Sequence, residues 1–164
     1  MSKLDNIHSK YPNLFKETTK IRCGEGWYWL IDNLCYQINQ YVEHKNNPNK
    51  YINQQLGSKF EEFESGNKFY VNINYIREKF GVLEVYCNDT DDEIYHYIKF
   101  ACNLSTKICE KCGSTKYMGK TEQWVKYLCM DCGKKDKNKW IPTKETEKQI
   151  RKDKLLKIHD NDNS

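Results

Sequence analysis

The sequence predicts an α+β fold: two amphipathic helices packed on a β-hairpin or small antiparallel sheet, followed by a C-terminal four-cysteine ribbon. Three observations predict it. Apolar residues recur at helical spacing from residue 27 and again from residue 94, they alternate with polar residues between positions 69 and 87, and two matching Cys-x-x-Cys-Gly sequences follow. A chain of 164 residues is long enough for a core of about 100 residues and a smaller appended module.

The composition indicates a folded chain with a modular organisation. Charged residues make up 30% of it, but 4 Trp, 12 Tyr and 6 Phe are too many aromatic residues for a disordered polymer. We expect an N-terminal lead-in at 1–22, an α+β core domain at 23–106, a zinc ribbon at 107–139 and a lysine-rich tail at 140–164. The apolar residues of the tail are spaced as in a single exposed helix.

The clearest helix is predicted from Trp27 to Val42. Its apolar residues recur three, four, seven and eight positions apart, which places them on one helix face. Glu25, near its start, suits the positive end of the helix dipole, and Pro48 ends the pattern. Apolar positions within residues 49–67 fit a second, short helix that closes in a Ser-Gly-Asn turn.

Two strands and a further long helix are predicted next. Apolar and polar residues alternate from Phe69 to Tyr75 and again from Leu83 to Cys87, and the linker at 77–81 favours an antiparallel hairpin. A polar cluster at 88–92 can turn the chain and cap a helix, after which helical spacing resumes at residues 94–102. This helix leads directly into the first cysteine pair.

The two Cys-x-x-Cys-Gly sequences carry the strongest chemical signal in the chain. Zinc prefers four soft ligands arranged tetrahedrally, and two thiolates on a tight turn supply half of that arrangement. The 16 residues between the pairs are enough for a strand that leads into the second turn, as in a zinc ribbon. We therefore predict one structural Zn²⁺, with no open position for a reacting water. Its ligands are Cys109, Cys112, Cys129 and Cys132.

Other readings of the cysteines and histidines are weaker. A redox dithiol is the alternative for the Cys-x-x-Cys pairs. A second metal site would need the four scattered cysteines, most of which fall on apolar faces of predicted elements, where we expect core packing. These are Cys23, Cys35, Cys87 and Cys102. The histidines have no ligand or triad spacing, so no catalytic residue is predicted; they are His8, His44, His96 and His159.

The turn from Arg22 to Trp27 is a candidate pocket. Its two glycines permit close backbone approach, and the amide groups at a helix start can bind an anion or a carboxylate. Arg22, Glu25 and Trp27 are the candidate pocket residues. The alternative is a helix cap in which Arg22 pairs with a local carboxylate and Trp27 is buried.

Basic and aromatic residues gather around the predicted zinc site. Nine lysines and four acidic residues lie between positions 107 and 139, in a chain whose net charge is only +4. Lysines beside exposed rings suit a nucleic-acid surface, although lysines on a ribbon also serve solubility alone. The candidate contacts for nucleic acid or another partner are Lys116, Lys120, Trp124, Lys126, Lys134, Lys135, Lys137 and Trp140.

Three motifs occur in an order that resembles a known family. They are an Arg-Cys-Gly-acid-Gly-Trp helix start at 22–27, a Lys-Phe-Gly-x-Leu hairpin at 79–83 and a terminal Cys-x-x-Cys at 109–112. The chain is similar over about residues 20–133 to short, largely uncharacterised proteins from bacteria and their phages. The resemblance implies one α+β unit with zinc knuckles in a phage or mobile-element setting, and it implies no activity.

These patterns favour a small non-enzymatic zinc-ribbon protein that contacts nucleic acid or a nucleic-acid-bound complex. One alternative is a protein–protein inhibitor or adaptor of a host defence complex, and another is a small hydrolase that uses the Arg22–Trp27 turn. No apolar run approaches the roughly 20 residues that span a bilayer, and no hydrophobic signal segment is present. We expect no membrane partner and a cytoplasmic location, in the host cytoplasm if the protein is phage-encoded. The sequence indicates no particular oligomeric state.

Overall fold

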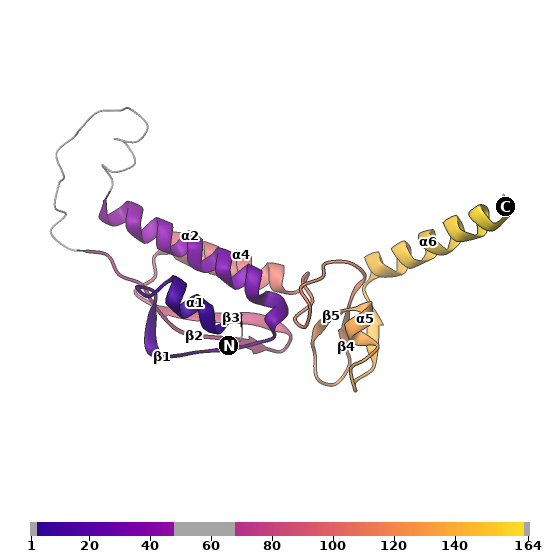
Figure 1. Ribbon diagram of the computed structural model, residues 1–164, viewed down its shortest axis with the longest axis horizontal. Coiled ribbons are helices and arrows are strands. Elements are labelled where there is room, and N and C mark those ends of the chain that lie inside the picture. Colours follow the sequence, from indigo (N-terminus) through magenta and orange to yellow (C-terminus); the bar gives the residue numbers. More distant parts are fainter. Residues whose placement is uncertain (1–2, 48–67, 163–164) are drawn as a thin grey trace, which may run out of the picture.

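Two small sheets and the helices around them make up the structure (Figure 1). The computed structural model describes residues 3–47 and 68–162, with side chains as far as residue 156. The first sheet and its helices form the core unit, the second sheet lies in the ribbon with four clustered cysteines, and the last helix projects away from both (Figure 1). The predicted α+β class with a C-terminal four-cysteine ribbon is confirmed. The short helix predicted within 49–67 lies outside the described residues.

The core sheet contains the predicted hairpin and one strand that the sequence pattern did not indicate. Strands β2 (Asn72–Lys79) and β3 (Val82–Asn88) pair antiparallel, as expected. Strand β1 (Phe15–Arg22) pairs parallel with β2, so the order is β1-β2-β3 and the sheet is mixed instead of antiparallel. Only Thr19 of β1 is buried. Because this edge strand is largely polar, it shows no alternation of apolar residues, and its segment was predicted only as a lead-in.

A β-bulge shifts the side-chain alternation within β2. The register slips between Ile73 and Tyr75, and Ile76 becomes the next fully buried residue after Ile73. Tyr75 instead lies on the opposite face, where its ring stacks against Tyr86 of β3 with 5.5 Å between the centroids. The unbroken alternation expected from residue 69 to residue 75 is therefore wrong beyond residue 73, because a bulge inserts one unpaired residue.

Helices cover the other face of the sheet. Helix α2 (Tyr28–Asn46) follows a single 3₁₀ turn, η1 (Glu25–Trp27), and lies beside α4 (Asp92–Ser105) (Figure 1). Both predicted amphipathic helices are confirmed, and α4 begins at an Asp91 cap whose carboxylate accepts the Ile94 amide. The short helix α1 (Asp5–Lys10) adds the fully buried Ile7, so the N-terminal segment supplies part of the core.

The ribbon sheet has the order β5-β4-β6. Strands β4 (Met118–Thr121) and β5 (Tyr127–Cys129) form a hairpin, and β6 (Trp140–Pro142) pairs with the other edge of β4. The sheet thus extends beyond residue 139, where the sequence placed the end of the ribbon. Between β5 and β6 lies the single-turn helix α5 (Met130–Gly133), and helix α6 (Lys144–Asp162) forms the tail. None of the described helices combines the length and apolar composition that crossing a membrane requires.

Candidate metal centre

The first cysteine pair lies on a tight knuckle directly after α4. The amide of Gly113 donates to the carbonyl of Cys109 at 2.8 Å, and the Cys109 amide donates to the carbonyl of Ser114 at 2.8 Å. Gly113 closes the turn with a φ of 78°, in the left-handed region that favours glycine. These bonds turn the chain back within six residues and bring both thiols to the same side of it.

The second pair is positioned by the end of β5 and by α5. Cys129 is the last residue of the strand, and Cys132 lies on the helical turn that follows. The Met130 amide donates to the carbonyl of Tyr117 at 2.9 Å, which ties this turn to the chain that enters β4. The second knuckle is therefore held by the sheet, and the first follows α4 and is tied to β5 by the Glu110 amide, which donates to the carbonyl of Tyr127 at 3.3 Å.

The four thiols converge on one point. Their sulfur atoms all lie within 4.8 Å of one another, and Cys112 Sγ and Cys129 Sγ are 3.6 Å apart. Four sulfurs at about 2.3 Å from a central ion would be spaced roughly 3.8 Å apart in a tetrahedron, so the geometry fits a metal ion. An all-thiolate set suits zinc or iron and fills every tetrahedral position. The predicted ligands Cys109, Cys112, Cys129 and Cys132 are thus brought together.

The Arg22–Trp27 turn binds the first knuckle through its backbone. The Gly26 amide donates to the carbonyl of Glu110 at 2.8 Å, and the Gly24 amide donates to the Glu110 carboxylate at 2.9 Å. The indole N–H of Trp27 donates to the carbonyl of Ile108 at 3.0 Å. Three hydrogen bonds therefore join the start of α2 to the residues around Cys109. We call this set of contacts the knuckle clasp.

The two glycines of the turn are required by the close approach of the knuckle. A Cβ at Gly26 would lie 2.2 Å from the carbonyl oxygen of Cys109, and a Cβ at Gly24 would lie 2.3 Å from that of Glu110. Both distances are far below van der Waals contact, so any side chain at either position would force the knuckle away. This explains why glycine occurs twice within three residues.

The three candidate pocket residues do not line one cavity. Trp27 is completely buried in the core, and Arg22 is exposed at the end of β1. Glu25 borders a shallow pocket of about 280 Å³, of whose lining neither Arg22 nor Trp27 is part. The amide groups of the turn that were expected to bind an anion are occupied by Glu110.

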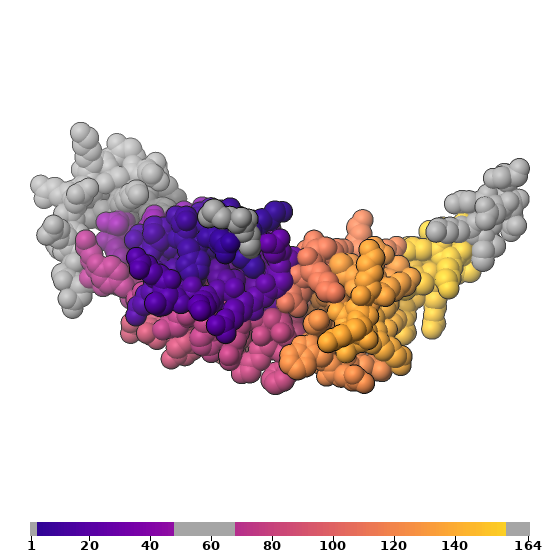
Figure 2. Space-filling view, turned by 60° about the horizontal axis from the view of Figure 1, so that its bottom comes forward, coloured from indigo at the N-terminus to yellow at the C-terminus, as the bar shows by residue number. Residues whose placement is uncertain are grey.

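A second contact joins the core unit to the ribbon at the β2–β3 turn. A Cβ at Gly81 would lie 3.1 Å from both the Val125 carbonyl oxygen and the ring of Tyr127, so the turn packs on the β4–β5 hairpin. Figure 2 shows the core unit and the ribbon directly against each other. The ribbon therefore touches the core in two places, one near the metal ligands and one at the hairpin.

Asp136 binds two lysines of the ribbon. The sequence pattern had indicated this residue only as one of the acidic charges of the segment. Asp136 has a side chain only 4% exposed and accepts from Lys111 at 3.2 Å and from Lys126 at 3.3 Å. Hydrogen bonds from the Asn138 backbone and these two ammonium groups hold the pKa of Asp136 far below its usual value. In the sequence, Asp136 is the one acidic residue between Lys134 and Lys139. This isolated acid in a lysine-rich segment is the signal that could have indicated its role.

The eight candidate contact residues divide into two groups. Lys126 is held by Asp136, and Trp140 packs its ring against Gly119 and Gly133 while its indole N–H donates to the carbonyl of Leu128 at 3.0 Å. Both side chains are therefore part of the ribbon structure. Trp124 is 66% exposed. The exposed lysines of the set are Lys116, Lys120, Lys134, Lys135 and Lys137.

Three of the four cysteines outside the cluster pack in or against the core, and the fourth, Cys102, is partly buried on α4. Cys35 is fully buried, and Cys23 and Cys87 contact the core from partly buried positions. Burial raises the pKa of the Cys23 and Cys87 thiols to about 12, so both stay protonated and unreactive at neutral pH. Among the described residues, the Cys109 cluster is the group whose ligand atoms converge for a metal.

Comparisons with protein-family models, with curated proteins and with solved structures gave no match for this chain.

Proposed function

We propose that the protein is a small, non-enzymatic zinc-ribbon binding module that contacts nucleic acid, or a nucleic-acid-bound complex, in a phage or mobile-element setting. The observation that carries the proposal is the exposed Trp124 on a ribbon that also presents the five exposed lysines of the candidate set. Aromatic rings can stack on bases, and ammonium groups can meet phosphates. The pairing of the two residue types on one small metal-held sheet supports a nucleic-acid partner.

Zinc is the proposed ion, and its role is structural. Four thiolates in a closed tetrahedral arrangement are typical of structural zinc, which needs no vacant position and undergoes no redox change. The turn that was the candidate hydrolase pocket has its amide groups bonded to Glu110 and its tryptophan in the core. The proposal of a binding module fits this use of the turn better than catalysis does.

Affinity purification of the tagged protein, with and without nuclease, tests the nucleic-acid proposal. We expect nucleic acid in the untreated eluate and its loss in a variant with Lys134, Lys135 and Lys137 each changed to Glu. A variant with Lys99 and Lys148 changed to Glu controls for the ribbon location, because these residues are exposed on α4 and α6. Direct binding should also weaken steeply with salt, since phosphate contacts release counterions. An affinity independent of salt contradicts the proposal.

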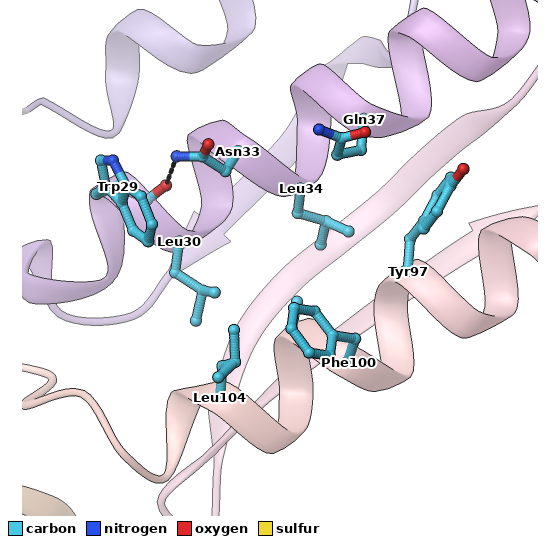
Figure 3. Close-up of a pocket in the computed structure, with 9 residues that line it drawn as sticks. Trp29, Leu30, Asn33, Leu34, Gln37, Tyr97, Phe100 and Leu104 are labelled. Atoms are coloured by element: carbon cyan, nitrogen blue, oxygen red, sulfur yellow. Dashed lines mark hydrogen bonds between the residues drawn. The ribbon is translucent and has the colours of Figure 1, made fainter.

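A protein–protein inhibitor or adaptor is the second candidate function, and a groove between α2 and α4 favours it. The groove has a volume of about 420 Å³ and a floor that includes Leu30, Leu34 and Ala101 (Figure 3). Trp29 and Phe100 flank it and are 66% and 65% exposed. Exposed aromatic anchors beside an apolar groove are typical of protein interfaces.

The same purification separates the two candidates. A stoichiometric protein that survives nuclease, and that is lost when Trp29 and Phe100 are changed to Gln, would favour the adaptor function. Retention of that protein by the Lys134, Lys135 and Lys137 variant would show that the ribbon lysines are not its contact.

A further inference from the structure

The face of the core sheet opposite the helices carries an aromatic stack. Tyr75 and Tyr86 are cross-strand partners, and their rings stack at 5.5 Å with 17° between the planes. The guanidinium of Arg77 lies 4.7 Å from the Tyr75 centroid. Tyr86, at the other end, is 52% exposed. The stack of guanidinium and two rings therefore offers a free aromatic surface at its Tyr86 end.

Cross-strand pairing places a row of cations on this same face. Lys20 of β1 lies opposite Tyr75, and Arg22 lies opposite Arg77. Side chains of directly opposed residues share a face of the sheet. The next row, Ile21 opposite Ile76, belongs to the core, which confirms that the cations point the other way.

The carboxylates on this face are too few to compensate the cations. Glu84, opposite Arg77, accepts from Arg77 at 2.5 Å and from Lys79 at 2.8 Å, so one carboxylate serves two cations. Among the described residues, no carboxylate pairs with Lys20 or Arg22. The face therefore keeps an excess of positive charge beside its aromatic stack.

The two arginines of this face differ in their partners. Glu84 accepts from Arg77, whereas no carboxylate among the described residues pairs with Arg22, which lies opposite Arg77 on the edge strand. Phosphate is an anion that Arg binds with two parallel hydrogen bonds. The exposed Arg22 guanidinium therefore suits a backbone phosphate of a polyanionic partner.

We propose that this open sheet face binds single-stranded nucleic acid: a base stacks on Tyr86, and the backbone phosphates meet Arg22, Arg77 and Lys20. The inference rests on the proposed nucleic-acid function and adds to the ribbon a second contact surface on the core sheet. A single strand fits because its unstacked bases are free to lie on a ring, whereas bases in a duplex are already stacked on each other.

Fluorescence anisotropy of the full-length, metal-loaded protein with labelled oligonucleotides tests this assignment. The probes are oligo(dT), oligo(U) and a duplex of the same length. The test variants are Tyr86→Thr, which keeps a strand-forming residue, and Arg22→Gln, which removes one exposed positive charge. The matched controls are Tyr95→Gln, since Tyr95 is 53% exposed on α4, and Arg151→Gln on the exposed surface of α6.

We expect single strands to bind more tightly than the duplex. Tyr86→Thr should weaken single-strand binding roughly 5- to 150-fold, the loss typical of one stacked base. Arg22→Gln should weaken binding and reduce the slope of log K against log salt by about 0.7, as for one lost phosphate contact. Its thermal midpoint should not fall, because Arg22 is exposed and has no ion-pair partner among the described residues, so reduced binding cannot be assigned to misfolding. Both controls should bind like the wild type.

The remaining outcomes overturn the inference in distinguishable ways. If the wild type binds nucleic acid but Tyr86→Thr and Arg22→Gln bind equally well, the sheet face is not the site and the ribbon proposal stands. Equal affinity for duplex and single strand also overturns it. If no probe binds, the proposed function fails together with the inference. If the wild type binds a polyglutamate peptide and Arg22→Gln abolishes that binding, the face is instead a site for an acidic protein.

Discussion

At the residue scale, Phe80 is the most exposed large hydrophobic side chain among the described residues, and its backbone is left-handed. It occupies the first position of the two-residue turn between β2 and β3, with a φ of 52°, and it is 78% exposed. Gly81 follows with a φ of 81°, so both turn residues adopt the left-handed conformation of a type I′ turn. Asn or Gly is favoured at the first position, and a ring there costs roughly 1–2 kcal/mol.

We predict that Phe80→Asn stabilises the protein by about 0.5–1 kcal/mol, because Asn enters the left-handed region more easily than Phe. Urea unfolding monitored by circular dichroism measures the change. Phe80→Val is the contrasting variant, since a β-branched residue is disfavoured at positive φ and should destabilise. A loss of stability in Phe80→Asn would show that the ring makes a stabilising contact and that this account of the turn is wrong.

The Asp91 carboxylate stabilises the start of α4, and this stabilisation depends on pH. The Asp91 side chain caps α4 and also accepts from the Tyr41 hydroxyl and the Lys45 ammonium. Burial alone would raise its pKa, but the hydrogen bonds from Lys45 and Tyr41 outweigh burial and lower the pKa to about 2. A carboxyl whose pKa is depressed on folding stabilises the fold above its unfolded pKa of about 3.9.

We predict that Asp91→Asn costs about 1 kcal/mol at pH 7, a value reduced for the partial exposure of the group. Asn retains the capping ability, so the loss reports the charge alone. The difference from the wild type should shrink as pH falls from about 4 towards 2, because protonation removes the same charge from the wild type. Denaturant unfolding of both proteins across this range measures it, and a difference that stays constant refutes the assignment.

At the element scale, the knuckle clasp decides how the ribbon is attached. The start of α2 approaches the Cys109–Gly113 knuckle so closely that only glycine fits at positions 24 and 26. Glu110 contributes both its carbonyl and its carboxylate to the contact, and burial raises the pKa of this carboxyl. A residue between two metal ligands is thus also a tertiary contact of the core.

We predict that Gly26→Ala destabilises the protein by about 1–3 kcal/mol or more, the usual cost of forcing extra atoms into a packed site. It should also weaken metal binding, because the methyl group displaces the Cys109 carbonyl. A competition titration with a chromogenic chelator measures the affinity. Glu110→Gln is the control, since its amide oxygen can still accept from Gly24, and it should bind metal nearly as the wild type does. Unchanged affinity in Gly26→Ala would contradict the clasp.

Sequence periodicity was sufficient for some elements and not for others. Helices α2 and α4 and the β2–β3 hairpin have one apolar face each, and that face produces the pattern. Strand β1 is a polar edge strand, and Trp140 enters β6 through a three-residue pairing, so neither has a periodic signal. The four metal ligands follow from spacing alone, because the knuckle is a local structure.

The contacts that join distant segments could not be predicted in the same way. Gly24 and Glu110 are 86 residues apart in the chain, and no local pattern indicates which backbone amide meets which carboxylate. The cationic sheet face likewise depends on the parallel pairing of β1 with β2, which brings Arg22 opposite Arg77. The sequence indicated some of these residues singly. Which residues they contact can be seen only in the folded structure.

At the scale of the whole molecule, the four-cysteine cluster lies where the ribbon joins the core unit. The first knuckle is part of the clasp with α2, and the β2–β3 turn packs on the ribbon hairpin. Loss of the metal should therefore also lower the stability of the core unit. Because metal binding and folding of a four-cysteine site are coupled, chelation or acidification that protonates the thiolates removes the same support. The central claim is that the metal is structural and that it holds the ribbon to the core through the clasp.

Hydrogen exchange at the Gly26 amide tests this claim most directly. That amide donates to the Glu110 carbonyl across the clasp, and the Ile76 amide in the core sheet provides the internal reference. We predict strong protection of Gly26 in the metal-loaded protein and much faster exchange after chelation, with a smaller change at Ile76. Protection of Gly26 that is the same with and without metal would show that the clasp forms independently, which would contradict the account.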